Sequence, residues 1–227
     1  MSPLHQQQLR SQQTYKLLLE SAVEVLRTSS PEDLRIPEIC KKCETNSASA
    51  YYHFGSKDGL VTKAYVELYK QNRLPDVEGF ELMAEIATST KQIIDIFVDS
   101  ITNPVSSQER KNSRNIRSRI YAAALINPDL ASELADLQDE YLARNTRAME
   151  TFQRKGLASQ SLSAHQYAVL LESLVVSRSI NDTHANPESD ESWAQIAVEV
   201  LQRFLIHWFL VIKGFSPLSG SFPYTSI

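Results

Sequence analysis

Hydrophobic residues recur at helical spacing along most of the chain. Leu18, Ala22, Val25 and Leu26 keep the period of an amphipathic helix within residues 12–27. Residues 190–213 keep the same period and carry a second apolar face, so this helix is expected to lie between two layers. No stretch shows the alternation that is typical of strands. The pattern therefore predicts an all-α protein.

Capping and breaking residues divide this pattern into separate helices. Asn46 and Ser56 are good N-caps for the segments that follow them, and Pro75 is expected to end the second of these segments. The predicted helices cover residues 12–27, 37–43, 47–54, 57–74, 79–103, 107–126, 128–155, 163–181 and 190–213.

The domain organisation follows from these breaks and from the charge distribution. We expect a flexible, glutamine-rich arm over residues 1–11, a small helical domain over 12–74 and a larger helical domain over 75–227. The net charge is −4, but it divides into +2 for residues 1–74 and −6 for the remainder. A mildly basic N-terminal part suits contact with an anion, although chance could also give this difference.

The amino-acid composition favours a soluble globular protein over a membrane-spanning or disulfide-rich one. Hydrophobic residues make up 42% and charged residues 22% of the 227 residues, as in soluble globular proteins. The longest apolar run, Phe204 to Ile212, is much shorter than the roughly 20 residues that span a membrane. The two cysteines cannot form a disulfide framework, which favours a reducing, cytoplasmic location without membrane contact.

The helix predicted over residues 47–54 has two distinct faces. Ala50 and Phe54 lie one turn apart and are expected to face the core. The opposite face carries small residues first and tyrosines later, a shape suited to entering a DNA groove. Backbone N–H groups and an ammonium at the start of the next helix would attract phosphate. The candidate DNA-contacting residues are Ser47, Ala48, Ser49, Tyr51, Tyr52, His53 and Lys57.

This stretch, IPEICKKCETNSASAYYHFGSKDGL, resembles the DNA-binding signature of the TetR family of bacterial transcriptional regulators. LLESA, at residues 18–22, resembles the family's first-helix motif, and the resemblance covers about residues 12–70. It implies a three-helix helix-turn-helix head, followed by a helical domain that binds an effector and dimerises. The partners would be a roughly palindromic DNA operator, a small-molecule effector of unknown identity and a second copy of the chain, and the regulator would be a repressor.

The sequence departs from the family pattern at three positions. Glu44 replaces the usual turn glycine, which is acceptable if the turn is not left-handed. Arg35 stands where a serine or threonine N-cap is common. Gly59 replaces an acidic residue.

Other chemistry finds less support in the sequence. The resemblance implies that Cys40 and Cys43 occupy positions of small, core-facing residues on the second helix, with a redox pair or half of a zinc site as the alternatives. Zinc needs four ligands and only His53 is near, so no metal is predicted. The sequence has no recognisable catalytic motif, so neither an enzyme nor a cofactor is expected. Two other functions stay open: a helical binding protein that does not read DNA, and a redox sensor using the two cysteines.

The larger domain offers candidates for two further surfaces. Five basic residues between Arg110 and Arg119 are either a solvated face, a site for an acidic ligand, or the joint between pocket and head. The candidate pocket residues, each of which also suits plain core, are Met83, Phe97, Arg117, Tyr121, Phe152 and Tyr167. The candidate dimer residues, on two helices expected to form a four-helix bundle with the partner's, are Leu171, Leu174, Val200, Phe204 and Trp208.

Overall fold

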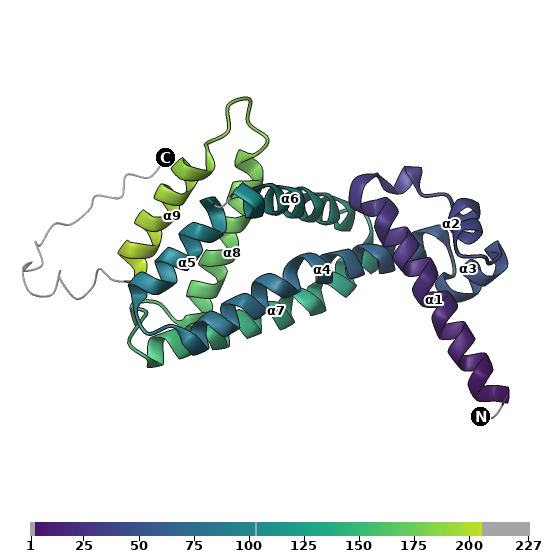
Figure 1. Cartoon of the computed structure of the whole chain (residues 1–227), viewed down its shortest axis with the longest axis horizontal. Helices are drawn as coiled ribbons and strands as arrows, with labels where there is room; N and C mark the ends of the chain where they lie inside the picture. The colour runs from purple at the N-terminus through teal and green to yellow at the C-terminus, as the bar shows by residue number, and fades with distance from the viewer. Residues whose placement is uncertain (1–2, 103, 206–227) are drawn as a thin grey trace, which may run out of the picture. The chain divides into compact units, whose positions relative to one another are not determined.

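The computed structural model describes residues 3–102 and 104–205, and within them every regular element is helical, as predicted (Figure 1). The elements are α1 (Pro3–Thr28), the 3-10 turn η1 (Pro31–Asp33), α2 (Ile36–Lys42), α3 (Ser47–Phe54), α4 (Lys57–Ile86), α5 (Thr90–Thr102), α6 (Pro104–Ala124), α7 (Pro128–Arg154), α8 (Ala164–Asn181) and α9 (Asp190–Leu205).

The chain forms two compact units. The first contains residues 1–80 and 109–144, and the second contains residues 81–108 and 145–227. The first unit therefore combines the predicted head with parts of α6 and α7, and the domain limits drawn from the sequence stay a prediction.

In the first unit, α1, α2 and α3 pack around one apolar core. Leu18, Ala22 and Leu26 on α1 are fully buried, which confirms the face predicted from their spacing. On α3, Ala50 is 2% exposed and Phe54 is 9% exposed, so both face inward as expected. Ala48, Tyr51 and Tyr52, on the other side of α3, stay exposed.

Local capping fixes where α3 and α4 begin. The side chain of Asn46 accepts a hydrogen bond from the Ser49 N–H at 2.9 Å, and Ser56 Oγ accepts one from the Gly59 N–H at 2.9 Å. Both predicted N-caps are confirmed. Arg35, the N-cap of α2, makes no such bond, which leaves the first N–H groups of α2 without a side-chain cap.

The boundaries predicted at residues 12 and 75 are wrong. The first helix begins at Pro3 and not at residue 12, because proline is well tolerated in a first turn and glutamines favour helix. The helix α4 continues through Pro75. Packing on both sides compensates for the hydrogen bond that proline removes: Tyr69 is 2% and Val77 1% exposed.

The break that was expected at Pro75 lies instead between α4 and α5, so the helix predicted over residues 79–103 is wrong at its start. Ser89 caps α5 by accepting a hydrogen bond from the Gln92 N–H at 3.2 Å, and the Gln92 side chain accepts one from the Thr88 N–H at 3.0 Å. A serine followed three residues later by glutamine is a capping signature that could have located this start.

In the second unit, α5 packs on α9, and a cluster of polar contacts around Arg178 stabilises the end of α8. The buried Arg178 guanidinium binds Asp190 at 2.8 Å and the Glu188 carbonyl at 2.9 Å, and it lies over the ring of Trp193 at 5.3 Å. These contacts fix the connection from α8 to α9.

Candidate nucleic-acid interface

The outward face of α3 carries the residues that the sequence selected for DNA contact. Tyr52 is 82% exposed and Tyr51 50% exposed, and Ala48 is also exposed. Ser47, Ser49, His53 and Lys57 are half-buried at the edges of this face. The structure thus places all seven on or beside one accessible surface, and their contact with DNA stays a prediction.

An aromatic cluster holds this face in place from behind. The ring of Tyr15, on α1, stacks on Phe54 with centroids 4.8 Å apart and meets the edge of His53 at 5.8 Å. Tyr52 contacts His53 from the other side at 5.2 Å. His53 therefore lies between two tyrosine rings, which fixes its orientation.

Sequence reasoning missed Tyr15 as a positioning residue. Its spacing from Leu18 and Ala22 places it on the same inward stripe of α1, and that spacing is the signal that could have found it.

The turn between α2 and α3 contains a residue, Glu44, in the left-handed backbone conformation. Glu44 has φ of 51°, which only glycine adopts without strain, so the condition under which glutamate would be acceptable here is not met. The Thr45 N–H donates to the Cys40 carbonyl at 2.9 Å and the Glu44 N–H to the Lys41 carbonyl at 3.3 Å. These two bonds form a Schellman motif with glutamate at the position that usually carries glycine.

Replacing Glu44 by glycine is therefore expected to stabilise the protein by about 0.5–1 kcal/mol. A left-handed L-residue costs about 1–2 kcal/mol, and the greater freedom of glycine in the unfolded chain offsets part of that gain. Urea unfolding of the wild type and Glu44→Gly measures the difference. Glu38→Gly, within α2 and equally exposed, is the control and should destabilise. A loss of stability in both variants would contradict the assignment.

Two glycines shape the junction between α3 and α4. Gly55 closes α3 at φ of 73°. A Cβ atom at Gly59 would lie 2.1 Å from the carbonyl oxygen of Phe54. The departure from the family pattern at Gly59 thus has a steric cause, because the backbone at the end of α3 lies where a side chain would stand.

The two cysteines take different positions in the core. Cys40 is 3% exposed, and burial raises the pKa of its thiol despite a hydrogen bond with the Ser47 side chain. The half-buried Cys43 donates from Sγ to the Leu17 carbonyl at 3.4 Å. The prediction of a small core residue is confirmed for Cys40. In the described part of the chain, no group of three or more His, Cys, Asp or Glu side chains could hold a metal ion.

Alkylation should distinguish the two thiols. We expect iodoacetamide to modify Cys40 in the native protein at least about tenfold more slowly than Cys43, because the thiolate is the reacting species and burial disfavours it. Mass spectrometry of the two cysteines over time measures this ratio. In concentrated urea the two rates should converge. Equal rates in the native protein would favour the redox-sensor alternative.

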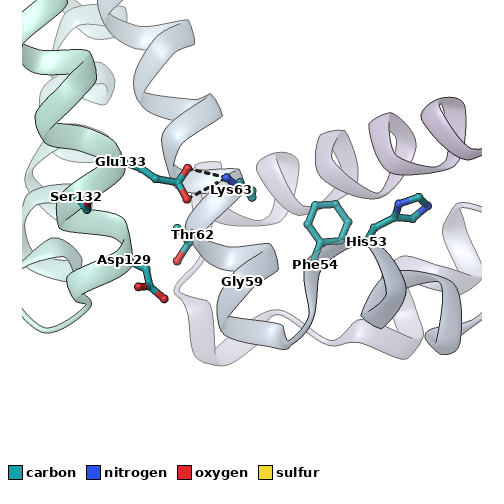
Figure 2. A pocket seen from close by; sticks show the side chains of 8 residues that line it. All are labelled: His53, Phe54, Gly59, Thr62, Lys63, Asp129, Ser132 and Glu133. Atoms are coloured by element: carbon teal, nitrogen blue, oxygen red, sulfur yellow. Dashed lines mark hydrogen bonds and ion pairs between the residues drawn. The ribbon is translucent and has the colours of Figure 1, made fainter.

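A cleft of about 300 Å³ lies behind the recognition face, between the start of α4 and the start of α7 (Figure 2). Lys63 Nζ binds both carboxylate oxygens of Glu133 at 2.9 Å, and the Asn127 side chain donates to Thr62 Oγ1 at 3.1 Å. These contacts join α4 to α7 close to the end of α3. The lining residues are His53, Phe54, Gly59, Thr62, Lys63, Asp129, Ser132 and Glu133, so the cleft contains none of the predicted pocket residues.

The predicted pocket residues are divided between the two units. Arg117 and Tyr121 lie in the first unit, one turn apart on α6. In the second unit Met83 and Phe97 are half-buried, whereas Phe152 and Tyr167 are each 2% exposed. Their role as a common pocket stays a prediction.

The predicted dimer residues are only partly described. Leu171, Leu174 and Val200 are half-buried, while the side chain of Phe204 and the whole of Trp208 lie outside the described residues. Other apolar side chains of α8 and α9 are more exposed: Val169 43%, Val176 45%, Ile180 60% and Ile196 42%.

The sequence of the head matches known regulators. Residues 18–64 match the family model of bacterial regulatory proteins of the tetR family. Uncharacterised HTH-type transcriptional regulators of Mycobacterium bovis and Mycobacterium tuberculosis are each 32% identical to this chain over 62 residues. The matched segment covers 27% of this chain and 29% of the length of these relatives.

Solved structures extend the similarity to most of the chain. A TetR transcription regulator from Haloarcula marismortui aligns with a TM-score of 0.64 at 14% identity, over 86% of this chain and 99% of that one. A protein from Saccharomonospora viridis, crystallised in complex with choline, aligns with a TM-score of 0.61 at 18% identity, over 85% and 96% of the two chains. At these identities the similarity shows the fold.

Proposed function

We propose that this protein, whose N-terminal domain is that of the TetR family, is a sequence-specific DNA-binding repressor that a small-molecule effector releases from its operator. The family consists of transcriptional regulators and not of enzymes. Within the described residues, no helix combines the length and the apolar character needed to cross a membrane.

The outward face of α3 carries this proposal. Small residues at its N-terminal end permit close approach to base edges, and the exposed Tyr51 and Tyr52 extend the contact toward phosphates. Lys57 follows at the first turn of α4, where free N–H groups and a positive charge favour an anion. The Tyr15 ring, the Asn46 cap and the left-handed turn fix this surface before DNA arrives.

Dimerisation and effector binding are part of the same proposal. TetR regulators form dimers and bind operators and small molecules. The exposed apolar residues of α8 and α9 suit pairing with a second copy, and two heads would then read a roughly palindromic site. The choline bound to the Saccharomonospora viridis protein supports a small-molecule site within this fold. A coupling of about 1–3 kcal/mol would suffice for release.

Selection of bound sequences from random double-stranded DNA tests the proposal. Purified protein is used at two salt concentrations beside the Tyr52→Ala/Lys57→Ala variant. Wild type should enrich a palindromic sequence that the variant does not enrich, because the variant lacks two side chains of the recognition surface. Lys70→Ala, which removes an exposed lysine elsewhere on α4, is the charge-matched control and should retain the enrichment.

Absence of an enriched sequence would contradict the proposal and favour a binding protein that does not read DNA. Binding that is lost at higher salt without any sequence preference would indicate nonspecific attraction to phosphates.

A further inference from the structure

The facing sides of α4 and α6 carry a polar cluster in the first unit that the proposed DNA contact does not use. On α4, Tyr69, Arg73 and Asp76 recur at helical spacing on one side. On α6, Arg117 and Tyr121 do the same. Polar contacts join the two helices at both ends of this cluster: Arg117 pairs with Asp76, and the Tyr121 hydroxyl lies beside that of Tyr69.

Arg117 is the central residue of the cluster. It is 6% exposed, and its NH1 group donates to Asp76 Oδ2 at 3.2 Å. A guanidinium has five N–H donors, and within the described residues this is the one hydrogen bond that Arg117 makes. Burial lowers the pKa of Arg117 and Asp76 opposes that effect, so the site favours a negative charge beside the guanidinium.

Asp76 supplies this negative charge, and its carboxylate has room to turn away from Arg117 into solvent. Its side chain is 38% exposed, although its partner Arg117 is buried. It also lies 3.7 Å from Arg73 and 3.9 Å from Arg110, so three guanidinium groups surround one carboxylate. Rotation of the Asp76 side chain toward water would open the same position to another carboxylate at little desolvation cost.

Tyrosine rings lie beside this cluster: Tyr69 and Tyr141 are buried, and Tyr121 is half-buried. The Tyr69 ring lies 6.1 Å from Tyr121 and is stacked 6.2 Å from Tyr141. The Tyr69 and Tyr121 hydroxyls are 3.5 Å apart, and burial raises the pKa of Tyr121, so its phenol stays neutral and can donate. The half-buried Tyr121 ring is the part of this aromatic group that the apolar or aromatic body of a carboxylate would contact.

We propose that this cluster is an anion-exchange site: the effector is a carboxylate with an apolar or aromatic body, and its carboxylate displaces that of Asp76 from Arg117. The claim that this exchange regulates DNA binding rests on the function proposed above. A quaternary ammonium such as the choline of the Saccharomonospora viridis structure would be repelled by Arg73 and Arg117.

The same helix offers a route from this site to the head. Arg119, on α6, donates to the Arg27 carbonyl at 2.7 Å and to the Ser29 carbonyl at 2.9 Å, at the end of α1. Exchange at Arg117 removes an ion pair between α4 and α6, while Arg119 keeps α6 attached to α1. A shift of α4 against α6 would therefore move the start of α4 relative to α1, and α3 lies between them in sequence.

Thermal unfolding of the full chain tests the site with three probe acids: benzoate, phenylacetate and octanoate. Each is compared with its amide and with chloride at equal ionic strength. At least one carboxylate should raise the Tm of the wild type, and its amide should not. Arg117→Gln should weaken the apparent affinity by at least about tenfold, equivalent to about 1.4 kcal/mol. Asp76→Asn should strengthen it several-fold, because the internal competitor is lost.

Lys111→Gln, an exposed change on the same helix, is the matched control and should behave as wild type. The site is refuted if none of the three acids raises the Tm, if amides act equally, or if Asp76→Asn does not strengthen binding. The Asp76→Asn measurement tests the site even if Arg117→Gln fails to fold. Carboxylate binding without any selected DNA sequence would refute the proposed function alone, and DNA selection without carboxylate binding would refute this site alone.

Discussion

Replacement of Gly59 by alanine is expected to destabilise the protein by about 2–3 kcal/mol and to weaken DNA binding strongly. The new Cβ would lie 2.1 Å from the Phe54 carbonyl oxygen, a contact that only a backbone shift can relieve. That shift occurs where α3 ends and α4 begins, so it reorients Tyr52 and Lys57 as well. Urea unfolding and fluorescence anisotropy with the selected operator measure the two effects.

The chain supplies controls for this substitution. Gly79 lies in the same helix, and a Cβ there would meet nothing within 4 Å. Gly79→Ala should therefore stabilise the protein by up to about 1 kcal/mol, as expected for a helical glycine in open space. At Gly55 there is also open space but φ is 73°, so Gly55→Ala should cost about 1–2 kcal/mol from strain alone. If Gly59→Ala and Gly79→Ala behave alike, the steric assignment of Gly59 is wrong.

Removal of the Arg119 side chain is expected to cost about 2 kcal/mol of stability. Its guanidinium donates two charge-assisted hydrogen bonds to carbonyls at the end of α1, where a helix leaves its last carbonyls without partners. The positive charge also suits the C-terminal end of the helix dipole. Urea unfolding of Arg119→Ala measures the loss.

Two further variants sharpen this result. Arg119→Lys should restore part of the stability, because an ammonium can reach one carbonyl but lacks the planar fork that reaches both. Lys111→Ala, an exposed change on α6, should alter stability by less than about 0.5 kcal/mol. If Arg119→Ala also changes the free energy of unfolding by less than about 0.5 kcal/mol, the two hydrogen bonds make no net contribution to stability.

Local chemistry explains which elements could be predicted from the sequence. The Asn46 and Ser56 caps act on N–H groups three residues away, so neighbouring residues alone identify them. The inward positions Ala50 and Phe54 follow from the helical period. These features place the recognition helix and its outer face, and so most of the candidate interface.

The errors arise where distant residues decide the outcome. Pro75 does not end α4, because Asp76 binds Arg117 and Val77 is buried, and neither partner is near in sequence. The apolar stripe of α1 places Tyr15 inward, but its partner Phe54 on α3 is distant in sequence. Arg119, on α6, binds the end of α1 through hydrogen bonds that no local pattern reports. The sequence leaves the conformation of Glu44 open, because glutamate rarely adopts the left-handed region that the turn requires.

The N-cap of α3 is an asparagine, Asn46, and an aspartate at this position would act differently on a nearby anion. Aspartate caps helices as well as asparagine does, and its charge would favour the helix dipole. Asn46 directly precedes the surface that we propose for DNA contact, and a carboxylate there would repel phosphates. A neutral cap fixes the start of α3 without placing a negative charge beside the proposed DNA-contacting residues.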